Sequence, residues 1–162
     1  RFVFIPNIDD VDRLDVTADG ATHTFTLARV TKKAAEAGAE DEVVTTYRSD
    51  GRDLAERYAA GRTPEEATEA AESAFKKFYQ SLIGLSIEGQ AQRPVHNAPV
   101  VTIRYRLNKG DRRDVTVTLA PYDKIFYASF VNGVGGFALT KAQAEGMLAK
   151  MDALLAGEDV KD

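Results

Sequence analysis

The segment 63–85 constrains the fold most, because it carries a start signal, an apolar stripe and a stop signal for a single helix. Thr63 and Glu66 have the Thr-x-x-Glu spacing of a capping box, and Pro64 suits the first helical position. Apolar side chains then recur every three to four residues, and Gly84 is placed to end the helix. The pattern predicts an amphipathic helix that buries one face.

The same device returns near the C-terminus. Thr140 and Gln143 have Thr-x-x-Gln spacing, an apolar stripe runs from Ala144 to Leu155, and Gly157 follows as a helix terminator. The sequence therefore predicts a second amphipathic helix.

Alternating apolar and polar residues, separated by tight-turn signals, precede the first helix. They predict strands at 11–18, 21–30 and 42–48, with Asp-Gly turns at 19–20 and 50–51. A short helix is expected at 53–60, and an exposed loop at 31–41.

The same layout precedes the second helix. It predicts strands at 100–108, 114–120 and 125–131, an Asn-Gly turn at 132–133, and a short fourth strand at 137–139.

These patterns predict a single α+β domain of two β-β-β-(β)-α repeats, at 11–85 and 99–157, joined by a connector at 86–98. Each repeat is expected to form an antiparallel sheet packed against one amphipathic helix. The alternative is an ordinary α+β domain without duplication, since hairpins followed by helices are common in that class. The helical pattern at 52–62 departs from the repeat, which predicts an aromatic strand there.

Composition excludes several classes of function. The net charge of −4 argues against nucleic-acid binding, which depends on neutralising phosphates. The absence of cysteine excludes disulfides, thiol chemistry and Cys-ligated metals. No apolar run approaches the roughly 20 residues of a membrane span. Because the chain begins at Arg1, we expect it to be part of a longer protein whose signal or anchor is absent.

The motifs that resemble functional sites have simpler structural interpretations. The stretch beginning at Asp15 resembles an EF-hand loop, but its twelfth residue is Thr26 rather than a bidentate carboxylate. The glycine-rich stretch 132–136 lacks the Gly-Lys-Ser/Thr of a phosphate loop and predicts a hairpin turn with a bulge. His23 and His96 have no nucleophile or metal motif beside them. The sequence thus predicts no catalytic residue, no cofactor and no metal, and an enzyme is not expected.

One surface is a candidate for binding an anionic partner: Arg104, Arg106 and Arg113. The first two share one face of a predicted strand, and the third lies in the hairpin that follows. Guanidinium groups bind carboxylate and phosphate through paired N–H donors. The alternative is a solvated sheet face, because Asp111 and Asp114 are interleaved with the arginines.

Two stretches, LAPYDKIFYASFVNGVGGFALTKAQAEGMLAKMDALLAG at 119–157 and IPNIDDVDRLDV at 5–16, resemble a bacterial domain-of-unknown-function family. In that family a tyrosine-rich strand, an Asp/Asn-Gly turn, a short aromatic strand and an amphipathic helix recur, often as a tandem repeat. Its members are commonly membrane-anchored by an N-terminal helix and encoded beside gliding-type or auxiliary ABC-transporter genes. The resemblance implies an extracytoplasmic domain, at the cell surface or periplasm-side, anchored by a segment outside this chain. It assigns no catalytic residue.

The leading hypothesis is a non-enzymatic extracytoplasmic interaction module with a protein partner, accessory to an ABC-transporter complex. The alternative is a small-ligand or anionic-ligand binding domain that uses the groove between the repeats. That alternative is motivated by the arginines and by five aromatic residues, Tyr105, Tyr122, Phe126, Tyr127 and Phe130. The oligomeric state stays open, and a lead-in strand at 2–5 is a candidate for pairing with another chain.

Overall fold

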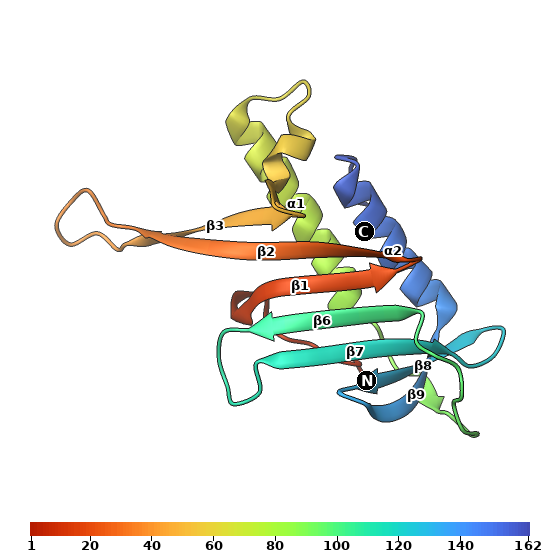
Figure 1. Ribbon diagram of the computed structural model, residues 1–162. Coiled ribbons are helices and arrows are strands. Elements are labelled where there is room, and N and C mark those ends of the chain that lie inside the picture. Colours follow the sequence, from red (N-terminus) through yellow and green to blue (C-terminus); the bar gives the residue numbers. More distant parts are fainter.

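The computed structural model describes residues 1–162 and has an α+β fold, with one antiparallel sheet and two α-helices (Figure 1). The strands are β1 (Val11–Ala18), β2 (Ala21–Lys32), β3 (Glu42–Ser49), β4 (Arg52–Asp53), β5 (Gly89–Gln90), β6 (Val101–Leu107), β7 (Asp114–Pro121), β8 (Phe126–Val131) and β9 (Val134–Thr140). The helices are α1 (Pro64–Ile83) and α2 (Lys141–Leu155), with 3₁₀ turns η1 (Ile8–Asp10) and η2 (Leu54–Tyr58). The nine strands lie in the order β4-β3-β2-β1-β6-β7-β8-β9-β5.

The pairing of β1 with β6 corrects the expectation of a separate sheet for each half. These are the first long strands of the two halves, and they pair antiparallel, with Leu14 opposite Tyr105 and Val16 opposite Ile103. Because each strand also pairs with its own hairpin partner, the two halves share one continuous sheet. A bulge at Asp12 shifts the register where this pair begins.

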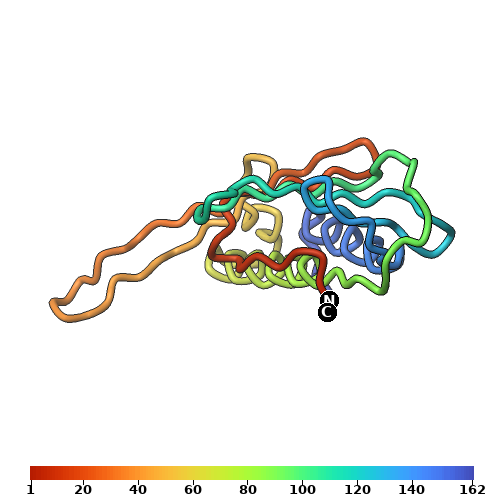
Figure 2. The backbone as a smooth tube through the Cα atoms, turned by 90° about the horizontal axis from the view of Figure 1, so that it is seen from below, coloured from red at the N-terminus to blue at the C-terminus, as the bar shows by residue number.

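Both helices pack on the same face of the sheet (Figure 2). Strand alternation directs Leu14, Val16, Phe25, Ile103 and Leu119 toward them, and all five are at most 1% exposed. The predicted stripes meet this face, as expected for amphipathic helices. The fully packed stripe residues of α1 are Ala67, Ala71, Ala74, Phe75, Phe78, Tyr79 and Leu82, and those of α2 are Ala144, Met147, Met151 and Leu154. Neither helix has the combination of length and apolarity needed to cross a membrane.

The predicted capping box of α1 is confirmed. The Glu66 N–H donates to Thr63 Oγ1 at 3.2 Å, and the Thr63 N–H donates to Glu66 Oε1 at 2.9 Å. The pKa of Glu66 is lowered, first by the hydrogen bond that its carboxylate accepts from the Thr63 N–H and then by the Thr63 side chain, because both favour the charged form.

The predicted box of α2 forms only in part. The Gln143 N–H donates to Thr140 Oγ1, but the Gln143 side chain turns away to Ser86. Its Oε1 accepts the Ser86 N–H at 2.8 Å, and its Nε2 donates to the Ser86 carbonyl at 3.2 Å. The capping glutamine therefore fixes the connector that follows α1 to the start of α2.

The turn predictions at 19–20, 50–51 and 132–133 are confirmed. Both residues of each pair have positive φ, which matches the twist of a two-residue hairpin. The bulge expected among the glycines is also present, as a register shift between Ser129 and Phe130 opposite that stretch.

Residues 53–60 form a short helix as expected, and it is of the 3₁₀ type. They contain the end of β4 and the 3₁₀ turn η2, which begins where the Asp53 side chain accepts the Ala55 N–H at 3.0 Å. The turn brings Tyr58 against the end of α2, where its hydroxyl donates to the Glu158 carbonyl at 2.7 Å. Burial, followed by the nearby Asp159 carboxylate, raises the pKa of Tyr58 to about 12.

The lead-in segment at 2–5 is not a strand of the main sheet. Phe2 makes one isolated bridge to Ser86, and the segment runs along α1 on the helix side of the sheet (Figure 2). Tyr79 on α1 holds it there by donating its hydroxyl proton to the Pro6 carbonyl at 2.6 Å.

The close contact between Gly157 and η2 generates a prediction. Gly157 has φ +70°, and a Cβ there would overlap the backbone carbonyl of Arg57. Gly133 has φ +79° with open space around it, so alanine there measures only the cost of placing a side chain at positive φ. We expect Gly157→Ala to lower the free energy of unfolding by about 1–3 kcal/mol more than Gly133→Ala, as measured by urea denaturation. Equal losses of stability in the two variants would show that the backbone of η2 moves away from the added Cβ at no cost in free energy.

Candidate ligand-binding groove on the open face of the sheet

No helix covers the sheet face opposite α1 and α2 (Figures 1 and 2). Threonines alternate along its strands, and the strand register aligns them across the sheet. One row runs Thr22, Thr17, Thr102 and Thr118 on four adjacent strands. The result is a surface of hydroxyl and methyl groups that no helix covers.

Three arginines gather on this face at the junction of the two halves. Arg13 on β1 lies directly opposite Arg106 on β6, and Arg104 lies two residues from Arg106 on the same face. Arg13 forms an ion pair with an aspartate of its own strand, and Arg106 with an aspartate of its own hairpin. Arg13 Nε lies 3.2 Å from Asp15 Oδ1, and Arg106 NH1 lies 2.8 Å from Asp114 Oδ2.

Arg104 has no carboxylate partner. Asp15 is its cross-strand neighbour, but that carboxylate binds Arg13 and also accepts the Thr24 hydroxyl at 2.6 Å. The exposed Arg104 guanidinium therefore keeps all of its donors available on this surface.

The three arginines line a groove of about 400 Å³ over β1, β6 and β7. Its charged lining consists of three guanidinium groups and two carboxylates, so it carries one net positive charge. The full lining is Arg13, Asp15, Arg104, Tyr105, Arg106, Asp114, Val115 and Thr116. Such a groove can bind a carboxylate or another oxyanion by charge-assisted hydrogen bonds.

Thr24 links the Asp15 carboxylate of the groove to Asp50, which lies outside the groove. Its backbone N–H donates to Asp50 Oδ1 at 2.8 Å, and His23 Nδ1 lies 2.8 Å from Asp50 Oδ2. Burial alone would raise the pKa of Asp50, but the hydrogen bonds from His23 and Thr24 together outweigh it and lower that pKa.

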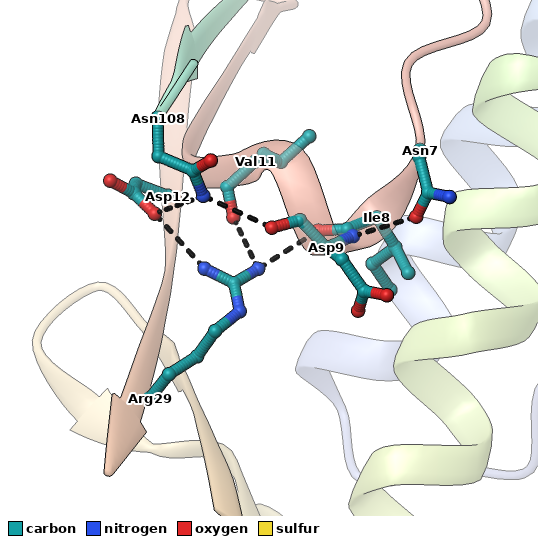
Figure 3. Close-up of polar contacts among 7 residues, drawn as sticks. All are labelled: Asn7, Ile8, Asp9, Val11, Asp12, Arg29 and Asn108. Atoms are coloured by element: carbon teal, nitrogen blue, oxygen red, sulfur yellow. Dashed lines mark hydrogen bonds and ion pairs between the residues drawn. The ribbon is translucent and has the colours of Figure 1, made fainter. Parts of the chain in front are cut away.

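A polar cluster fixes the end of the sheet beside the groove (Figure 3). Arg29 donates to Asp12 Oδ1 at 2.9 Å and to the backbone carbonyls of Ile8 and Val11. Asn108 donates to the same Asp12 oxygen and to the Asp9 carbonyl, both at 3.0 Å. The cluster ties β2, η1 and the β6–β7 loop together. It therefore fixes the end of β6 that carries Arg106.

The structure brings together two of the three predicted arginines. Arg104 and Arg106 line the groove, whereas Arg113 lies in the β6–β7 loop, where its Nε donates to the Gly110 carbonyl at 3.4 Å. Sequence reasoning missed Arg13. Its alternation within β1 indicates the open face, but only the β1–β6 pairing reveals that it neighbours Arg106.

The aromatic residues that motivated a binding groove do not form one together. Tyr105 is 2% exposed and packs edge-on against Phe4 on the helix side, with ring centroids 5.1 Å apart. Tyr127 faces the same side under Lys141, and Tyr122 stacks beneath Arg93 at the sheet end. Phe130 lies on the opposite face of β8 from Tyr127, because it pairs with Thr118 of the open face.

The remaining motifs take the structural forms expected of them. The EF-hand-like stretch is the β1–β2 hairpin, and the glycine-rich stretch is the β8–β9 hairpin. No cluster of three or more His, Asp and Glu side chains suited to a metal ion occurs in the chain.

Comparisons of the chain with protein-family models, with curated proteins and with solved structures give no match.

The lowered pKa of Asp50 predicts a pH-dependent contribution to stability. A carboxylate whose folded-state pKa lies below its unfolded value of about 3.9 stabilises the fold above that value, and this is lost as pH falls through the folded pKa. We expect Asp50→Asn to destabilise more at pH 5 than at pH 2.5, by less than about 1 kcal/mol since the pair is one-third exposed. Urea denaturation at both pH values measures this. Asp111→Asn, in an exposed loop, serves as the control, and an equal loss at both pH values would contradict the assignment.

Proposed function

We propose that this chain is a non-enzymatic interaction module that binds an acidic protein partner on the open face of its sheet. The observation that carries the proposal is the exposed Arg104, which has no carboxylate partner. It shares the groove with Arg13 and Arg106, each of which is paired with an aspartate. A partner carboxylate placed there would complete the charge pattern, and a guanidinium group can bind both of its oxygens.

The strand order supports a finer proposal about how this groove arose. Outward from the β1–β6 pair the order is β1-β2-β3-β4 on one side and β6-β7-β8-β9 on the other, and a helix follows each series. We propose two β-β-β-β-α repeats joined through their first strands. The arginine groove then lies between the repeats, where the alternative hypothesis expected a ligand.

A small anionic ligand is the second candidate function. The groove volume of about 400 Å³ falls within the range of small-molecule sites, about 300–1,000 Å³, which favours this candidate. Competition between citrate and an acidic peptide separates the two. A partner-binding face prefers the peptide, whose further residues contact the threonine rows, and a small-ligand site binds citrate at least as well.

The test of the main proposal uses an octapeptide of glutamate with blocked ends, titrated by NMR at low salt. We expect the Arg104 side-chain resonance to shift on binding, and Arg104→Gln to weaken binding at least about tenfold. Lys124→Gln removes the same charge from the exposed β7–β8 loop and is expected to change the affinity less than about twofold. Equal effects of the two variants would reduce the interaction to net charge and contradict the proposed site.

The family resemblance extends the proposal to location. We propose that the domain is extracytoplasmic, is anchored by a segment outside this chain, and serves an ABC-transporter complex. The expected result is that the full-length protein sediments with membranes and that external protease cleaves this domain in intact cells. A protected protein in the soluble fraction would contradict the location and leave the Arg104 test unaffected.

A further inference from the structure

The β2–β3 hairpin projects from the body as an arm (Figure 1). Its strands stay paired as far as Lys32 and Glu42, beyond the part of the sheet that the helices cover (Figure 2). β3 is the outermost long strand at this edge, because β4 pairs only with Arg48 and Ser49. The remainder of β3 has no strand on its outer side.

The register identifies which backbone groups are left over. In an antiparallel pair, the residues that bond across alternate with residues whose N–H and C=O point away. The Asp50 N–H donates to the Thr24 carbonyl, so the even-numbered residues of β3 bond to β2. The N–H and C=O groups of Val43 and Thr45 therefore point outward, where no strand pairs with them, whereas the pairing with β4 begins beside Tyr47.

The opposite edge strand, β9, is covered by a further strand. There β5 pairs with β9, and the backbone N–H groups of Glu88 and Ala91 donate to the carbonyls of Ala138 and Gly136 at 2.8 Å. Natural proteins protect free edges with lysine, proline, bulges or covering loops. The sequence Val-Val-Thr-Thr-Tyr at 43–47 has none of these, and Val43 is 60% exposed.

A pocket of about 240 Å³ lies beside this edge, between β3, η2 and α1. Residues 44–47 line one side, Ala55 and Ala71 supply apolar walls, and Asp53 and Glu72 supply carboxylates. No lysine or arginine lines it. In strand addition, backbone hydrogen bonds hold the incoming strand and pockets for alternate side chains select it.

We propose that the outer edge of β3 binds an extended segment of a partner protein, and that a lysine or arginine of this segment enters the pocket beside it. The apolar walls suit the aliphatic stem of such a side chain, and the carboxylates suit its charged end. Glu72 already pairs with Lys76 at 2.9 Å, and it retains lone pairs for a second cation. A second copy of this chain fits less well, because residues 42–47 of β3 contain no lysine or arginine to offer.

The test uses a blocked octapeptide of alternating threonine and valine with one central lysine, and a matched peptide with glutamate in its place. The lysine peptide is expected to slow amide hydrogen exchange at Val43 and Thr45 and to bind at least about tenfold tighter than the glutamate peptide. Equal affinities, or no protection of these two amides, would overturn the proposal.

Two variants separate the edge from the pocket. Thr45→Pro removes an outward N–H without removing a bond to β2, and is expected to weaken the lysine peptide at least about tenfold, whereas Thr45→Val keeps the affinity within about twofold. Glu72→Gln leaves the edge intact and is expected to reduce the preference for lysine over glutamate at least about threefold, so the proposal stays testable if the proline variant unfolds the arm.

Sedimentation of the chain alone tests the other occupant. A monomer is expected over the concentration range of the titrations. A concentration-dependent dimer that Thr45→Pro abolishes would replace the partner segment with a second copy.

Discussion

The antiparallel pairing of β1 with β6 is the interaction on which the rest of the structure depends. It joins the first strands of the two halves, and every other strand is added outward from this pair. It also sets the position of both helices, because Leu14, Val16, Ile103 and Tyr105 form the middle of the surface on which they pack. Without this pair each half would have an unprotected edge strand and half of a core.

The same pairing brings like charges together. Arg13 and Arg106 lie directly opposite each other, an arrangement that normally destabilises a sheet. The flanking Asp15 and Asp114 carboxylates offset the repulsion, and Arg104 remains without a counter-ion. The cluster of three arginines distinguishes this part of the open face from the rest of it.

The local elements were predictable from the sequence, because their signals are local. Capping residues, Asp-Gly pairs and strand alternation give the helices, the turns and most strand boundaries. The predictions failed where a distant partner decides the outcome. The single sheet and the neighbourhood of Arg13 need the β1–β6 register, and the Gln143 side chain bonds to Ser86 instead of to the start of its own helix. Two of the three arginines of the groove were therefore found from the sequence: Arg104 and Arg106 share a strand, whereas Arg13 lies on another one.

The bracing of the arm by Arg29 has a mechanical consequence. The three hydrogen bonds that Arg29 donates hold the arm at its base, while the loop at 33–41 lies at its far tip (Figure 1). Because β2 and β3 stay paired as far as Lys32 and Glu42, a group attached to this loop lies in the direction in which these strands run. Exposed loop tips tolerate inserted residues. A fluorophore or a small fused domain introduced near Gly38 would therefore report the orientation of the sheet while leaving both of the proposed binding surfaces free.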